Sequence, residues 1–161
     1  MKGTPMRLLT LIIAFFAFTA AAEPKPRAGW AVHETDYGYQ ELIDRLKSAV
    51  KANKMGVVTQ AGPTGAAKAR GIDIPGNRVI GVFNNKFAVQ MLNASTAAMI
   101  EAPVRFYVTE QPDGSATLSY KTPSHVFFPY LEDNLEVGKI AAHLDEVFAK
   151  IAADAVAPAT E

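Results

Sequence analysis

The fold is decided by residues 102–123, which read APVRFYVTEQPDGSATLSYKTP. Apolar and polar side chains alternate over residues 104–109 and again over residues 116–121, and this is the period of a half-buried β-strand. Between these runs, Pro112, Asp113 and Gly114 suit a three-residue loop, because proline fixes φ, aspartate bonds its own turn and glycine tolerates the left-handed region. The stretch therefore predicts a β-hairpin.

The apolar pattern also predicts the register of the hairpin. If Gln111 pairs with Ser115, then Phe106 faces Tyr120 and the apolar sides of both strands form one surface. A slip by one residue would put the apolar side chains of the second strand on the opposite face. The pattern therefore favours a single pairing.

The same register places Arg105 opposite Lys121 on the other face of the hairpin, with Tyr107 beside them. Two like charges that face each other across strands are unfavourable unless water or an acidic group meets them. Solvation is one interpretation of this face. The other is that Arg105, Tyr107 and Lys121 form an interaction face for an acidic protein partner.

Residues 1–22 have the layout of a secretory signal peptide. Lys2 and Arg7 precede an apolar run over residues 8–18, and small residues lead to Ala22, after which cleavage is expected. The apolar run is shorter than the ~20 residues that a membrane-spanning helix needs, although an uncleaved anchor is the alternative. We therefore expect a periplasmic or secreted protein with no membrane contact after cleavage.

The rest of the chain reads as a mobile polar lead at residues 23–29, one domain at residues 30–154 and a frayed tail at residues 155–161. The sequence contains no cysteine, which excludes disulfides, thiolate nucleophiles and iron–sulfur ligation. Its 16 basic and 16 acidic residues leave no net charge for binding nucleic acid.

Strand and helix patterns follow one another along the domain. Helices are expected at residues 39–53, 86–92 and 135–153, with a short helical turn at 64–69. Asp133 and Glu136 have the spacing of a cap for the last helix. Strands are expected at residues 30–34, 56–60, 78–83 and the hairpin, followed by an extended aromatic segment at 124–130. This order predicts an α+β fold with a single antiparallel sheet and helices packed on one face.

Three segments together resemble the domain of unknown function 302 family. They are PGNRVIGVFNNKFAVQML at residues 75–92, EAPVRFYVTEQPDGSATLSYKTP at 101–123 and GKIAAHLDEVFAKI at 138–151. The resemblance covers most of residues 31–153. It implies a β-α-β-β-β-β-α domain with a layout similar to TATA-box-binding-protein-like folds, commonly as a homodimer. It implies neither a nucleic-acid role nor catalytic residues, because a shared layout does not transmit function.

The histidines and aromatic residues are the remaining candidates for chemistry. His33, His125 and His143 lack the spacing of a metal site, so no metal or cofactor is expected. A possible ligand pocket consists of four residues near the end of the chain, which are His125, Phe127, Phe128 and Tyr130. The alternative is that these aromatic side chains belong to the core.

These features favour an exported accessory or binding module without a catalytic centre. We expect it to be a homodimer. The alternative is a carrier of a small ligand such as haem, or a cofactor-independent enzyme, built on the segment around His125. The interaction face and the ligand pocket are separate predictions, and each depends on where the tertiary structure places its residues.

Overall fold

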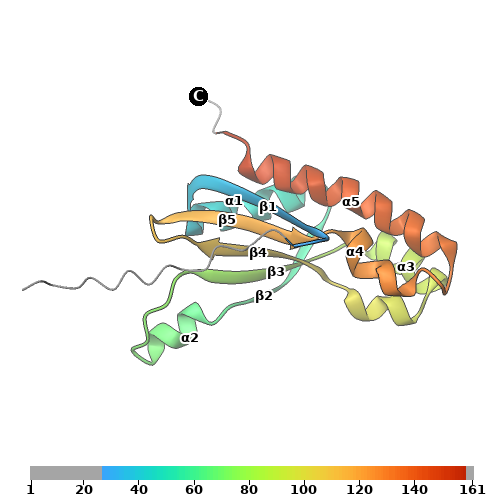
Figure 1. Ribbon diagram of the computed structural model, residues 1–161, viewed down its shortest axis with the longest axis horizontal. Coiled ribbons are helices and arrows are strands. Elements are labelled where there is room, and N and C mark those ends of the chain that lie inside the picture. The colour runs from blue at the N-terminus through green and yellow to red at the C-terminus, as the bar shows by residue number, and fades with distance from the viewer. Residues whose placement is uncertain (1–26, 159–161) are drawn as a thin grey trace, which may run out of the picture.

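The computed structural model describes residues 27–158, shown in Figure 1. Its strands are β1 (Trp30–Gly38), β2 (Gly56–Ala61), β3 (Asn77–Phe83), β4 (Val104–Glu110) and β5 (Ser115–Lys121). Its helices are α1 (Tyr39–Ala52), α2 (Thr64–Ala69), α3 (Asn85–Ala94), α4 (Pro123–Phe127) and α5 (Leu135–Val156). Two 3-10 turns, η1 (Ala97–Glu101) and η2 (Phe128–Tyr130), lie on either side of the hairpin in the sequence. The predicted signal peptide and residues 23–26 of the lead lie outside the described residues.

The described strands form one antiparallel sheet in the order β1-β5-β4-β3-β2. The predicted hairpin is confirmed as β4 and β5, with Phe106 opposite Tyr120. The backbone N–H of Gln111 donates to the carbonyl of Ser115 at 2.8 Å, as the predicted register requires. Gly114 has a φ of 87°, which is the left-handed conformation expected of a glycine in this turn.

Helices α1 and α5 cover one face of the sheet, and the core lies between them and the strands (Figure 1). At its centre the ring of Phe106 stacks on Phe148 of α5, with centroids 4.8 Å apart, and touches Tyr120 at 4.9 Å. Phe106 and Phe148 are completely buried. The α+β fold with helices on one face of a single sheet is therefore confirmed. Helix α2 projects from the end of β2, away from α1 and α5.

The segment predicted to be extended, residues 124–130, is helical. It forms α4 and η2. Thr122 caps α4 by accepting a hydrogen bond from the backbone N–H of His125, and Pro123 occupies the first turn, where its missing N–H is not needed. The threonine-proline pair is therefore a helix start, and the prediction of an extended segment was wrong because it weighed the prolines only as strand boundaries.

The start of α5 also differs from the prediction. Asn134, rather than Asp133, caps the helix, since its side-chain oxygen accepts from the N–H of Glu136 at 3.0 Å. Asp133 instead accepts a hydrogen bond from the hydroxyl of Ser95, at the end of α3. The carboxylate of Asp133 thus links the end of α3 to the start of α5. The spacing of residues 133–136 alone could not indicate this role.

Helix α5 continues to Val156, three residues beyond the predicted end, and includes the start of the predicted tail. Ala155 is completely buried, and its carbonyl accepts a hydrogen bond from the Nε of Arg45 in α1 at 2.8 Å. The carbonyl of Ala157 accepts from the same guanidinium and from the hydroxyl of Tyr37, the latter at 2.7 Å. Side chains distant in sequence therefore satisfy the carbonyls at the end of this helix.

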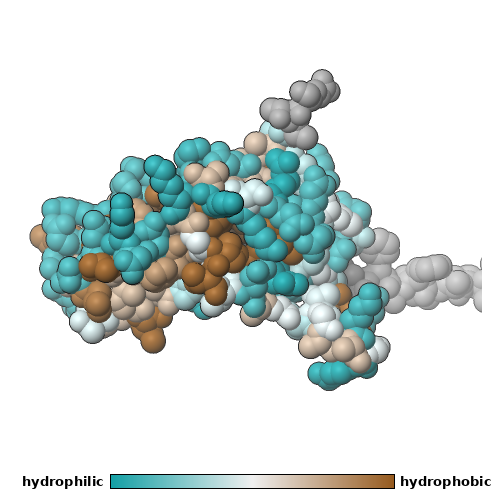
Figure 2. Space-filling model, turned by 180° about the vertical axis from the view of Figure 1, so that it is seen from behind, coloured by the Kyte–Doolittle hydropathy of each residue, from teal (hydrophilic) through white to brown (hydrophobic). Residues whose placement is uncertain are grey.

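One end of the molecule exposes several large apolar side chains. Figure 2 shows hydrophobic residues gathered at the end of the molecule that carries α3 and α4 in Figure 1. The most exposed are Leu135 at 82 %, Ile100 at 79 % and Phe128 at 69 %. Val89 and Leu92 of α3 are also exposed. We call these five residues the apolar end.

Candidate functional site: the uncovered face of the sheet

The face of the sheet opposite α1 and α5 carries the predicted interaction residues. Because side chains alternate along β4, Phe106 points into the core while Arg105 and Tyr107 lie on the uncovered face. Tyr107 pairs with Ser119 of β5, and Lys121 follows two residues later on the same face. The structure thus brings Arg105, Tyr107 and Lys121 onto one surface, with Arg105 and Lys121 exposed.

Two residues that the sequence analysis did not single out join this face. Trp30 of β1 pairs with Lys121, whose Nζ lies 5.9 Å from the centre of the Trp30 ring system. The guanidinium carbon of Arg27 lies 5.8 Å from the same centre. Both distances fall within the range over which an aromatic face attracts a cation. We call Arg27, Trp30, Arg105, Tyr107 and Lys121 the cationic face.

All residues of the cationic face except Arg27 line a hollow of about 460 Å³, to which β3 also contributes Asn77 and Val79. The side-chain amide of Asn77 donates a hydrogen bond to the hydroxyl oxygen of Tyr107, which fixes the phenol ring. Among residues 27–158 the Tyr107 hydroxyl donates to no acceptor. Its proton is therefore available to a ligand oxygen.

The positive charges of this face are not neutralised within the described part of the chain. The ion pairs found there join Lys47 to Asp44, Lys139 to Glu136 and Lys150 to Asp154, and none involves the cationic face. One carboxylate, Glu101, also borders the hollow. It accepts a hydrogen bond from the hydroxyl of Tyr130 at 2.9 Å, and this bond raises the pKa of the tyrosine.

Charge on the uncovered face is unevenly distributed along the sheet. Glu34 lies on this face as well, but it pairs with Thr117, towards the turn of the hairpin. Lys121 of β5 and Arg105 of β4 lie at the opposite end of the strands, away from the turn of the hairpin. Positive charge is thus concentrated near Trp30.

The side chains of the predicted ligand pocket point in different directions. Phe127 points into the core and is 3 % exposed, whereas its neighbour Phe128 is 69 % exposed. His125 is exposed and packs against Gly29, where an added Cβ would come within 2.1 Å of the imidazole. Tyr130 turns toward Glu101. The cause is the helical geometry of this segment, in which successive side chains are turned by about 100° from one another.

The three histidines lie apart from one another. His33 is in β1, His125 in α4 and His143 in α5. Residues 27–158 contain no group of three or more histidine, aspartate and glutamate side chains placed to hold a metal ion. In the same part of the chain, no helix is long and apolar enough to span a membrane.

His33 is the histidine whose environment affects its protonation. It is half-buried, its ring lies parallel to Tyr120 with centroids 6.2 Å apart, and its buried Nε2 has no hydrogen-bond partner in the described residues. Desolvation by burial lowers the pKa of His33 below its usual value of 6.5. The folded state therefore favours the neutral imidazole.

This burial predicts an acid-dependent loss of stability. Neutral His33 contributes fully to the free energy of unfolding above pH 6.5, and this contribution is lost as the pH falls through the lower pKa of His33 in the folded state. The reason is that, as the pH falls, the unfolded chain binds the proton before the folded chain does. Chemical denaturation measured from pH 7.5 to pH 5 should show a falling free energy of unfolding. His33→Gln should flatten this dependence, while His143→Gln, at an exposed position, should keep it. If the free energy of unfolding of the parent and of His33→Gln fell equally with pH, His33 would not be the cause of the acid-dependent loss.

Comparison with known proteins agrees with the fold. The model of the domain of unknown function DUF302 matches residues 31–155. An uncharacterised conserved DUF302 protein from Bacillus stearothermophilus has a similar structure, with a TM-score of 0.69 at 19% sequence identity, covering 80% of this chain and 99% of that one. At this identity the likeness establishes the fold alone. No curated protein matches the chain. Since the family model spans most of the described domain, the chain belongs to the DUF302 family.

Proposed function

We propose that this DUF302 protein is an exported binding module that docks an acidic protein on its cationic face. The observation that carries the proposal is the grouping of Arg105, Lys121 and Arg27 around Trp30 and Tyr107, on a sheet face that no described helix covers. Export is supported by the signal-peptide pattern of residues 1–22. No side chain of this face has the geometry of a nucleophile paired with a base, so the proposal assigns binding and not catalysis.

An acidic protein fits this face for two physical reasons. Cations without an internal partner attract carboxylates and steer their approach over long distances. The rings of Trp30 and Tyr107 add apolar contact area that loses little conformational entropy on binding, and such residues are typical of binding surfaces. A carboxylate could also accept a hydrogen bond from the Tyr107 hydroxyl.

The tryptophan provides a direct assay, because Trp30 is the single tryptophan of the chain and lies within the proposed site. An oligo-glutamate peptide should change the emission of Trp30 on titration, and the affinity should weaken as salt is added. The double substitution Arg105→Glu and Lys121→Glu should weaken binding by at least about a hundredfold, corresponding to about 2.8 kcal/mol. Isothermal titration calorimetry would give the affinities.

The control is Lys68→Glu, which reverses one charge, against two in the double variant, on exposed α2, away from the cationic face. It should leave the affinity for the peptide unchanged. A loss of binding free energy in Lys68→Glu about half as large as in the double variant would mean that only the overall charge matters. An unchanged affinity in the Arg105 and Lys121 double variant would exclude the cationic face as the docking site.

A homodimer is the second part of the proposal. Its support is the apolar end, because a soluble monomer rarely exposes several large apolar side chains together. A dimer formed there leaves the cationic face open for the acidic partner. Sedimentation equilibrium should give twice the chain mass for the parent and for the Arg105 and Lys121 double variant. A monomeric double variant would instead assign the cationic face to the dimer contact.

A further inference from the structure

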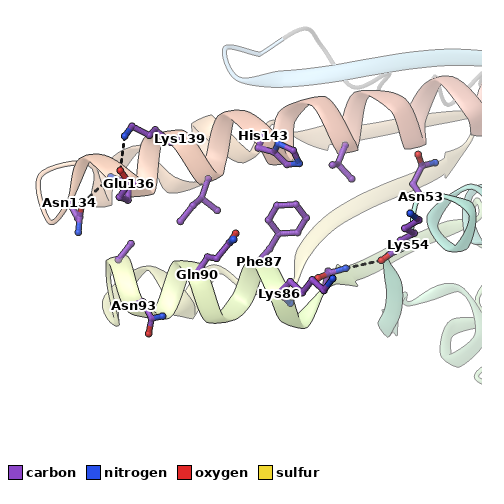
Figure 3. A pocket seen from close by; sticks show the side chains of 14 residues that line it. Asn53, Lys54, Lys86, Phe87, Gln90, Asn93, Asn134, Glu136, Lys139 and His143 are labelled. Atoms are coloured by element: carbon purple, nitrogen blue, oxygen red, sulfur yellow. Dashed lines mark hydrogen bonds and ion pairs between the residues drawn. The ribbon is translucent and has the colours of Figure 1, made fainter.

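A second surface hollow lies between α3 and α5, and it shares no lining residue with the cationic face. It has a volume of about 930 Å³ and extends along both helices (Figure 3). Lys86 and Asn93 line it from α3 and are seven residues apart, so about 10 Å of helix axis separates its two ends. We call this hollow the α3–α5 groove.

The floor of the groove is apolar. The ring of Phe87 points from α3 toward α5 and meets His143, with centroids 5.3 Å apart and an angle of 40° between the rings (Figure 3). Ile140 and Val147 of α5 also line the groove. These four side chains are half-buried or exposed, so an apolar ligand group could still cover part of their surface.

The two ends of the groove differ in charge. Lys54 and Lys86 lie together at one end, as Figure 3 shows, and neither forms an ion pair with any residue of the range 27–158. Toward the other end, Lys139 is paired with Glu136 at 2.6 Å. One end is therefore positively charged while the other is neutralised internally.

Neither Lys54 nor Lys86 occupies a position where a lysine stabilises the fold. Lys54 follows α1 with a φ of 59°, a left-handed conformation that glycine or asparagine usually adopts at the end of a helix. Lys86 lies in the first turn of α3, where the helix dipole disfavours a cation. Asn84 holds the two segments together, since its side-chain amide donates to the carbonyl of Lys54 at 2.8 Å while its oxygen caps α3.

The rim of the groove also carries uncharged polar side chains. It carries five carboxamides from four segments of the chain, which are Asn53, Asn84, Gln90, Asn93 and Asn134. In Figure 3 the side chain of Gln90 points across the groove toward α5. Carboxamides bind polar atoms without adding charge, so they leave the lysine end as the anion-selective part.

We propose that the α3–α5 groove binds an amphipathic carboxylate about 10 Å long, with its carboxylate between Lys54 and Lys86 and its apolar chain on Phe87, Ile140 and Val147. The volume is within the range of small-molecule sites, and an apolar floor bordered by polar side chains that can orient a ligand is found in such sites. Both ammonium groups attract the carboxylate, and the chain covers part of the ring of Phe87 from water.

Decanoate is a suitable probe, and decanamide is its uncharged counterpart of equal length. Titrated into ¹⁵N-labelled full-length protein, decanoate should shift the amide resonances of Lys54, Lys86, Phe87 and His143. Decanamide should bind about tenfold more weakly or worse, corresponding to about 1.4 kcal/mol. This comparison requires no variant and therefore does not depend on folding. Equal affinity for the two probes, or shifts confined to other surfaces, would overturn the proposal.

The double substitution Lys54→Gln and Lys86→Gln should weaken decanoate binding by about tenfold and leave the weak binding of decanamide unchanged. Lys68→Gln in α2 is the matched control and should have no effect on either probe. The Arg105→Glu and Lys121→Glu variant should retain the decanoate affinity, so this site and the cationic face are tested separately. A Lys54 and Lys86 variant with the parent's affinity for decanoate would refute the role of the lysines.

Discussion

Phe106→Ala is expected to lower the free energy of unfolding by about 3–5 kcal/mol. The ring is completely buried at the centre of the sheet, stacked on Phe148 of α5 at 4.8 Å and packed against Tyr120 at 4.9 Å. Its removal deletes apolar surface from the core and leaves a cavity that the strands and α5 cannot close completely. Urea denaturation followed by circular dichroism would measure the change.

The matched control is Phe128→Ala, which removes the same side chain from a position that is 69 % exposed. At protein concentrations where the chain is monomeric we expect a change within about 0.5 kcal/mol, because surface substitutions away from specific contacts have small effects. At concentrations where the chain is dimeric, a larger loss in Phe128→Ala is expected, because the proposed dimer contact covers the apolar end. Similar small losses in both variants would contradict the assignment of Phe106 to the core.

Arg45→Met is the second substitution for which a large effect is expected, with a loss of about 2–3 kcal/mol, since hydrogen bonds to charged groups are the stronger ones. The guanidinium donates to the carbonyls of Ala155 and Ala157 and lies over the ring of Tyr37, 4.0 Å from its centre. Methionine keeps the apolar stem and removes these contacts. The carbonyl of buried Ala155 would then lose its side-chain donor, while that of Ala157 would keep the hydroxyl of Tyr37.

Amide hydrogen exchange would locate the effect of Arg45→Met. Protection should fall first in the last turn of α5, with a smaller change in the hairpin. Lys47→Met on the same helix is the control, because Lys47 makes only an exposed ion pair with Asp44 at 3.6 Å. Its stability should differ from that of the parent by less than about 0.5 kcal/mol. An equal loss in both variants would mean that the positive charge of α1, and not the contact with α5, is responsible.

The two proposed binding surfaces illustrate what could be predicted from sequence. Arg105, Tyr107 and Lys121 were predicted to share a face because the hairpin register depends only on local alternation and turn chemistry. Trp30 was missed, since its place beside Lys121 depends on β1 pairing with β5, which is a contact over about ninety residues. A tryptophan at the start of a strand carries no local indication of its neighbour.

The α3–α5 groove had no indication in the sequence. Lys54, Lys86 and His143 come from three separate segments, and each alone resembles a solvated side chain. The segment around His125 shows the opposite case, in which residues adjacent in sequence are separated in space. Its residues were grouped because they are adjacent in sequence, whereas a helical turn separates them in space: Phe127 enters the core and Phe128 faces out.

The sequence by itself determined the strand and helix periods, the hairpin register, the α+β class and the membership of the DUF302 family. These properties depend on interactions between residues close in the chain, where alternation and turn geometry leave few choices. Only the tertiary structure decided the strand order, the burial of Phe127 against the exposure of Phe128, and the placement of Lys54 and Lys86 along one groove. The reason is that packing of distant apolar faces selects among arrangements that are locally equivalent.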